Sequence, residues 1–305
     1  MTTHSIEPTA ATLHYDFSRE RSPVLEIDSG DTVLFRTLDA GAHLEPFTGD
    51  RSCPRMDGAG PGHALCGPVY VRGARPGQTL AVELVEIRPS AWGSTGGGGY
   101  ESKLNERVGV QDEPMTWFAW TLDPDAGTAV NQYGYIVDLR PFMGVIGLPP
   151  DEPGSHPTGP PRFCGGNLDC KELVAGSTLY LPITVDGALF SIGDGHGRQG
   201  DGEISGMAIE CPMDRVEVKL SVLDEPRLQM PRSTTPAGWV TFGLHEDIED
   251  AIHIATREML DFLVERGFQR KQAIAFASVV VDVRITQLVN GVVGAHAVLP
   301  HEYYR

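Results

Sequence analysis

The strongest constraint on the fold is the alternation of apolar and polar residues in the first two-thirds of the chain. Three segments alternate on both sides of a turn that contains glycine: VLEIDSGDTVLFRTLDA (24–40), GPVYVRGARPGQTLAVELVEI (67–87) and VAGSTLYLPITVDGALFSIGD (174–194). Because successive side chains of a β-strand point to opposite faces, a period of two predicts strands. In the first segment the pattern places Val33, Phe35 and Thr37 on one face.

Two stretches interrupt this pattern. Ser90–Pro114 contains four consecutive glycines and little periodicity, and Pro149–Pro161 reads PPDEPGSHPTGPP. Proline lacks the backbone donor that a strand ladder or a helix interior needs. We predict two long loops, each of which is either a surface excursion or a lid or subunit contact.

The last third of the sequence predicts two main helices and a final strand. HEDIEDAIHIATREMLDFLVERG (245–267) has apolar residues at three- and four-residue spacing, an acidic start and a terminal glycine, as an amphipathic helix has. RKQAIAFASV (270–279) predicts a second helix, and VVVDVRITQLV (279–289) returns to strand. A β-rich part of about residues 1–235, followed by a part with helices and a strand over 236–305, predicts an α+β protein in which helices cover a sheet.

Charge and composition exclude several partners. The net charge of −17 disfavours nucleic acid, because an acidic surface repels phosphate backbones. No apolar run approaches the roughly 20 residues that cross a bilayer, and the N-terminus lacks the basic and apolar regions of a signal peptide. Five cysteines without CxxC spacing predict reduced thiols rather than disulfides. We therefore expect a cytoplasmic protein without nucleic-acid or membrane partners.

The stretch GDGHGRQGDGE (193–203) admits two chemistries. Its glycines at Gly195-x-Gly197-x-x-Gly200 fit the dinucleotide-binding pattern, whose pyrophosphate requires a helix after the glycines. The following DGEISGMAIECP contains two glycines and a proline and alternates, which predicts a strand. The nucleotide interpretation is therefore disfavoured.

The same stretch fits a metal site better. Asp194 and His196 are two residues apart, so both point to one side of an extended backbone, and Asp201 and Glu203 repeat this spacing after a glycine-rich reversal. Glycines let the backbone fold closely enough for the two pairs to converge. An imidazole with carboxylates suits zinc or a similar divalent ion. The alternative is a glycine-rich turn with solvated acids.

The sequence resembles a known protein family. FSIGDGHGRQGDGEISGMAIE is similar to the signature of the acetamidase/formamidase family, whose core is GD-x-H-x-x-QGDGE. Further segments agree, in the family's order: GPVYVRGARPGQTLAVELVEI, CGGNLDCKEL, GSTLYLPITVDGALFSIGD and VDVRITQLVNGVVGAHAVLP. The resemblance implies a single domain over residues 1–305, a layered β/β/α fold, assembly as a homo-oligomer (dimer or higher), and metal-dependent hydrolysis of a short-chain amide to ammonia and a carboxylate.

This chain also departs from the family pattern. Gly197 stands where many relatives have alanine, and Arg198 adds a positive charge beside it. The segment 155–164 is rich in proline. These differences leave open an amidase for a different or cyclic amide.

We assign candidate roles under metal-assisted hydrolysis, in which a divalent cation, zinc first, activates water and polarises the carbonyl group. Asp194 and His196 are the first predicted ligands, and Asp169 and Asp39 complete the set. Glu203 is the predicted proton shuttle, a role that Asp201 could exchange with it.

Further candidates come with plainer alternatives. Asn167 could donate a ligand or orient the amide, although N-x-D after two glycines is also common in turns, and Asp39 could instead bond its own backbone at the strand end. His43 and Glu45 are weaker candidates. His296 and Cys164 fit a core histidine and a small buried residue better than a ligand and a nucleophile. The competing class is a non-catalytic protein that binds a metal or small molecule on the same fold, and the intact motif argues against it.

Overall fold

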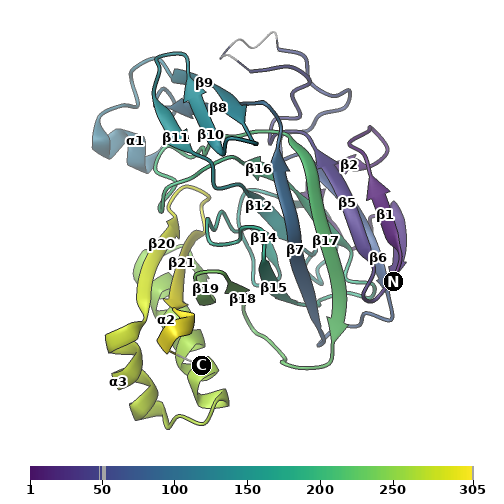
Figure 1. Cartoon of the computed structure of the whole chain (residues 1–305), viewed down its shortest axis with the longest axis vertical. Coiled ribbons are helices and arrows are strands. Elements are labelled where there is room, and N and C mark those ends of the chain that lie inside the picture. The colour runs from purple at the N-terminus through teal and green to yellow at the C-terminus, as the bar shows by residue number, and fades with distance from the viewer. Residues whose placement is uncertain (48, 50–52, 304–305) are drawn as a thin grey trace.

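The computed structural model describes residues 1–47, 49 and 53–303 and is built mainly of β-strands (Figure 1). Its largest element is a nine-stranded sheet in which β1 pairs with β5 in parallel and the other neighbours are antiparallel. In spatial order the strands are β1 (Thr3–Ile6), β5 (Thr32–Thr37), β17 (Met213–Leu223), β7 (Thr79–Pro89), β15 (Ser177–Pro182), β18 (Arg232–Thr235), β19 (Gly238–His245), β21 (Val293–Leu299) and β20 (Asp282–Gln287).

A six-stranded sheet faces this one. It contains β14 (Gly165–Asn167), β12 (Phe142–Gly147), β16 (Phe190–His196), β6 (Leu65–Arg72) and β2 (Leu13–His14), with β4 (Leu25–Asp28) paired to β6. Side chains from both sheets form one apolar core, in which the rings of Phe35 and Phe190 lie 6.2 Å apart. Val33, Phe35 and Thr37 are all buried, as their shared face predicted.

Each of the three alternating segments passes from one sheet to the other. The glycine turns connect β4 to β5, β6 to β7, and β15 to β16, and in each case the two strands belong to different sheets. The turns thus stack the sheets instead of forming hairpins. Alternation identified the strands, but it carries no information about which strand each one pairs with.

The helices form a third layer, as the sequence predicted. α2 (Ile248–Glu265) and α3 (Arg270–Val280) lie beside β19, β20 and β21 at one end of the large sheet (Figure 1). Asp247 caps α2 by accepting hydrogen bonds from two backbone N–H groups. Gly243 of β19 allows the close approach, because a Cβ there would lie 1.9 Å from the Ala251 carbonyl oxygen. The α+β class with a β/β/α layering is confirmed.

The prediction of one long loop over Ser90–Pro114 is wrong. This region contains β8 (Trp92–Gly97) and α1 (Lys103–Val108), and β8 is the edge of a small sheet with β9 (Thr116–Asp123), β10 (Thr128–Asn131) and β11 (Ile136–Asp138). The glycine-rich strand forms because large neighbours cover it: a Cβ on Gly96 would touch Trp117 and Met207. The glycine-rich composition of this segment does not predict a strand, because it does not show which side chains pack against it.

The other predicted loop is largely confirmed. Within Pro149–Pro161 only β13 (His156–Pro157) is strand, paired with β3 (Asp16–Phe17). One short element remains: η1 (His301–Tyr303) is a single 3₁₀ turn near the C-terminus. None of the described helices is both long and apolar enough to cross a membrane.

The strand predicted after Gly200 does not form. Residues 201–212 are irregular and make only isolated bridges, from Gly202 to Gln287 and from Glu210 to Ser94 and His196. Gly202, Glu203 and Gly206 have φ values of 91°, 45° and 74°, outside the extended region that a regular strand occupies. The segment instead folds back over the end of β16.

Candidate active site

The D-x-H pair lies on β16, inside the molecule. Asp194 and His196 are both buried, and the His196 Nε2 atom lies 3.3 Å from Asp194 Oδ1. Two-residue spacing on a strand brings the side chains to the same side, as expected.

Three further carboxylates surround this pair. Asp169 follows β14, and Glu203 and Glu210 come from the irregular segment after β16; all are buried. Glu210 Oε2 lies 3.3 Å from His196 Nε2. We call Asp169, Asp194, His196, Glu203 and Glu210 the acid cluster. It lines a cavity of about 190 Å³, together with Ala40, His63, Asn167, Gly206, Met207 and Asn290.

Several polar atoms of this cavity lack a partner. Within the described part of the chain, one carboxylate oxygen of each of the four acids makes no hydrogen bond: Asp169 Oδ1, Asp194 Oδ1, Glu203 Oε2 and Glu210 Oε2. Among the described residues, Asp194 Oδ1 and Glu210 Oε2 have only the ion-pair contact with His196 Nε2. Asn167 Oδ1 and His196 Nδ1 are also buried and unpartnered. Buried polar atoms are normally satisfied, so such a concentration points to a bound group.

The electrostatics of the cluster agree. Burial, with repulsion from Asp194, raises the pKa of Asp169 to about 6, and the same two causes raise the pKa of Glu210 to about 7. Burial and the nearby Asp169 raise the pKa of Glu203 well above its ordinary value. Burial opposes the charge of His196, but the carboxylates of Glu210 and Asp194 outweigh it and raise the His196 pKa. Four acids around one imidazole leave an excess of negative charge that a cation would neutralise.

The cluster also stores backbone strain. Asp169, Asp194 and Glu203 have φ values of 48°, 60° and 45°, in the left-handed region that residues other than glycine seldom adopt. This conformation costs roughly 1–2 kcal/mol for each residue. Strain at three acids of one cavity is a feature of functional sites.

Gly144 of β12 forms the floor of the cluster. A Cβ at this position would lie 2.5 Å from Asp194 Oδ2, 2.6 Å from Asp169 Oδ1 and 2.9 Å from His196 Cε1. Only glycine leaves these three side chains room to converge. No sequence pattern distinguishes Gly144, because a lone glycine in a strand gives no indication of what it faces.

Other residues at the cavity were also missed. Asn290 Nδ2 donates to Asp169 Oδ2 at 2.5 Å, and Gln199 Nε2 donates to the Asp169 carbonyl oxygen at 2.8 Å. His63 Nε2 lies 3.9 Å from Asp194 Oδ2, and Thr158 Oγ1 bonds both the ring and the backbone N–H of His63. Together these contacts fix the orientation of Asp169 and Asp194.

Asn167 lies at the cavity, where the sequence placed a candidate. Its Nδ2 atom donates to the Gly159 carbonyl oxygen at 3.0 Å. That bond leaves the unpartnered Oδ1 as the free acceptor of the amide group.

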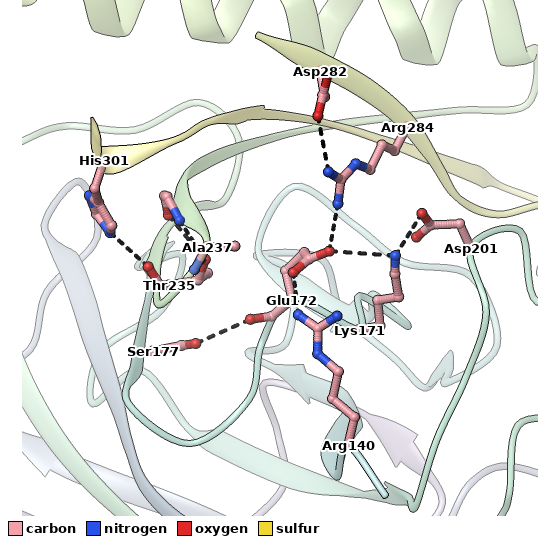
Figure 2. Close-up of polar contacts among 11 residues, drawn as sticks. Arg140, Lys171, Glu172, Ser177, Asp201, Thr235, Ala237, Asp282, Arg284 and His301 are labelled. Atoms are coloured by element: carbon pink, nitrogen blue, oxygen red, sulfur yellow. Dashed lines mark hydrogen bonds and ion pairs between the residues drawn. The ribbon is translucent and has the colours of Figure 1, made fainter. Parts of the chain in front are cut away.

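Asp201 and Asp39 lie outside the residues that line this cavity. Asp201 accepts from Lys171 Nζ at 2.7 Å (Figure 2). Asp39 is buried and accepts from the backbone N–H of His43, and its Oδ2 lies 2.7 Å from His43 Nδ1. The hydrogen bond to the local backbone is the alternative that the sequence left open for Asp39.

Figure 2 shows the ion pair that Asp201 forms with Lys171. Lys171 also lies 3.5 Å from Glu172, a buried carboxylate that accepts from Arg140 and from Arg284. Burial alone would raise the pKa of Glu172, but Arg140 and Lys171 lower it below the ordinary value. This ion-pair network connects the segment after β14, which also carries Asp169, to Arg284 of β20 and to Arg140, which lies just before β12.

The weaker candidates lie elsewhere. His43 pairs with Asp39 and stacks on Phe47, and neither His43 nor Glu45 is among the described residues that line the cavity. Burial raises the pKa of the Cys164 thiol to about 12, so a thiolate nucleophile is disfavoured there. Burial lowers the pKa of His296 to about 4, and its ring bonds Thr286 in the core.

Comparison with known proteins places the chain in a family. The model of the Acetamidase/Formamidase family matches residues 2–156 and 152–304. The chain belongs to this family. The matches run across the whole acid cluster, so the cluster belongs to the part that the family model covers.

Individual proteins of similar sequence and of similar structure carry formamidase and acetamidase names. The chain is 27% identical over 232 residues to a putative formamidase of Schizosaccharomyces pombe, covering 59% of this chain and 56% of the relative. It is 28% identical over 201 residues to an acetamidase of Mycolicibacterium smegmatis, covering 48% and 50%. The match thus spans about half the length of these relatives. The crystal structure of an acetamidase from Bacillus halodurans superposes with a TM-score of 0.86 at 29% identity, over 98% of both chains.

Proposed function

We propose that this protein hydrolyses a short-chain amide to ammonia and a carboxylate at the acid cluster, with a divalent cation, zinc as first choice. The observation that carries the proposal is the set of four buried acids whose unpartnered oxygens line one small cavity. Family membership and the names of the relatives support the reaction class.

The residues present fit a cation. Asp169, His196 and Glu203 form one group of potential ligand atoms within 4.8 Å of one another, and Asp194, His196 and Glu210 form a second. The space above Gly144 and the unpartnered oxygens are consistent with an ion between these side chains. We propose Asp194, His196, Asp169 and Glu210 as the ligands, in place of the earlier set with Asp39.

A divalent cation held there lowers the pKa of water and polarises a carbonyl oxygen. Glu203 is the carboxylate that we propose as proton shuttle. Its raised pKa favours uptake of a proton from water, and its Oε2 has no competing partner in the described structure. The ion pair with Lys171 disfavours Asp201 in this role.

Asn167 is placed to recognise the amide. Its free Oδ1 can accept a hydrogen bond from the substrate –NH₂ group, since its Nδ2 is held by Gly159. This contact would select a primary amide and orient its nitrogen towards the proton that Glu203 delivers. The homo-oligomeric assembly that the family resemblance implies is a further proposal.

The test is ammonia release from formamide, acetamide and longer primary amides by the purified protein, before and after removal of metal with a chelator. We expect turnover that chelation abolishes and added zinc restores. Bound metal without ammonia from any amide would instead support the non-catalytic binding protein. Full turnover by rigorously metal-free protein would rule out the cation.

A further inference from the structure

The cavity of the acid cluster is already large enough for the smallest amides. Acetamide has four non-hydrogen atoms and needs about the room of four water molecules, or ~120 Å³ at about 30 Å³ each. The cavity of about 190 Å³ holds such a molecule. A substrate with a larger acyl group needs further space beside this cavity.

A second, larger space adjoins this cavity. A chamber of about 340 Å³ lies between the small sheet and the segment after β16, and its walls include Phe118, Trp120, Val137, Met207 and Ile209. We call it the apolar chamber. Glu203 and Met207 line both the apolar chamber and the cavity of the acid cluster, so the two spaces adjoin at these two residues.

The walls of the apolar chamber are held in place. Trp120 donates from Nε1 to Thr95 Oγ1 at 3.1 Å, and Thr95 Oγ1 donates to the Ala208 carbonyl oxygen at 2.6 Å. The rings of Phe118 and Trp120 lie edge to face, 6.1 Å apart. These contacts tie the small sheet to the segment that carries Glu203. The chamber is a formed pocket of the size that ligand sites have, with aromatic and aliphatic walls.

We propose that the apolar chamber binds the acyl group of the substrate, which makes the preferred substrate a primary amide with a larger apolar acyl group than that of acetamide. The inference rests on the amide hydrolysis proposed above and names its substrate class. The acyl carbon chain lies in the chamber, while the –C(=O)NH₂ group lies in the cavity of the acid cluster. The walls of the chamber also include the charged residues Arg198, Asp201 and Glu203, and Arg198 Nη1 donates to the Asp138 carbonyl oxygen at 2.7 Å.

The other large space at the site has a different character. A cavity of about 640 Å³ reaches the acid cluster at His63, and its walls include His14, Asp16, Arg21 and Asp57. Both spaces have charged side chains in their walls, but the residues that line this cavity include no counterpart to the wall of Phe118, Trp120, Val137, Met207 and Ile209 in the apolar chamber. This cavity suits water and the released ammonia better, which leaves the apolar chamber for the acyl group.

The test is a series of primary amides, acetamide, butanamide, hexanamide and phenylacetamide, assayed by ammonia release. We expect kcat/KM to rise about fourfold for each methylene that enters the chamber, the factor that burial of one CH₂ supplies. Phe118→Ala should lower the ratio of kcat/KM for phenylacetamide to that for acetamide by about 10-fold. Phe118→Leu keeps an apolar wall and disturbs the packing less than alanine, so it should lower this ratio less.

Tyr135→Ala is the matched control. The centroids of the Tyr135 and Phe118 rings lie 6.2 Å apart, but Tyr135 does not line the chamber. The ratio of kcat/KM values should therefore stay at the parental value. Acetamide as the best substrate, or an unchanged ratio in Phe118→Ala, would overturn the inference. Calorimetric binding of the same amides separates the two proposals if no ammonia is released: affinity that rises with chain length supports the chamber, and flat affinity rejects it.

Discussion

At the scale of single residues, some side chains of the site can be predicted from the local sequence and others cannot. Asp194 and His196 were predicted together because two-residue spacing on a strand fixes their relative direction. His63 and Asn290 reach the same cavity from distant segments, and no local pattern surrounds them, whereas Glu210 lies in the segment after β16 that also carries Glu203. Their convergence is a consequence of tertiary contacts, which spacing along one segment cannot show.

Gly144→Ala tests the floor of the cluster. The added methyl group would lie within 3 Å of atoms of Asp194, Asp169 and His196, so these side chains must move apart. We expect turnover to fall by about 100-fold, the cost of misplacing reacting groups by about 1 Å, while circular dichroism shows a retained fold. Gly97→Ala is the control, since its Cβ would meet nothing closer than 3.8 Å. Equal turnover in the two variants would contradict the role of Gly144.

At the scale of elements, strand and helix positions followed from periodicity, but contacts between elements did not. Alternation located β5, β7 and β15, whereas β8 was missed because Trp117 and Met207, not its own glycines, stabilise it. The Pro-rich segment was identified as a loop from its composition. Its part in the site depends on Thr158, a buried residue that holds His63.

Thr158→Val tests this link between the loop and the site. Valine keeps the shape but removes the hydroxyl group that bonds both the ring and the backbone N–H of His63. We expect turnover to fall about 10-fold, as for partners that orient groups at a metal site, and the free energy of unfolding to fall by about 1–2 kcal/mol. Thr158→Ser keeps the hydroxyl and should retain most of the turnover. Similar rates for the valine and serine variants would show that the loop does not orient His63.

At the scale of the whole molecule, the layered β/β/α fold was predictable in class but not in strand order. The order of the large sheet joins strands far apart in sequence, such as β5 and β17, through long-range packing. Burial in this sandwich also sets the charge state of residues away from the site. His14 is buried between Asp16 and Ser191, and burial lowers its pKa to about 4.

This pKa predicts a loss of stability in acid. The unfolded chain takes up a proton at His14 near pH 6.5, whereas the folded protein does so only near pH 4. The contribution of His14 is therefore complete above about pH 6.5 and is lost as the pH falls towards 4. Between pH 7 and pH 5 the loss is about 2 kcal/mol in the free energy of unfolding.

Urea unfolding of the parent and of His14→Gln at both pH values measures this contribution. The variant should lose about 2 kcal/mol less than the parent between pH 7 and pH 5, because glutamine does not titrate. An equal loss in both proteins would show that His14 is not buried in its neutral form.

The most direct test of the proposed chemistry is Glu203→Gln, with bound metal and ammonia release measured on one preparation. Glutamine keeps the volume and removes the base, so turnover should fall by roughly 100-fold or more. Metal content should stay at the parental level, because the proposed ligands, Asp169, Asp194, His196 and Glu210, are unchanged. Reduced metal occupancy, with turnover partly rescued by added zinc, would make Glu203 a ligand instead. Retained metal together with retained turnover would contradict the proposed role of Glu203 in amide hydrolysis.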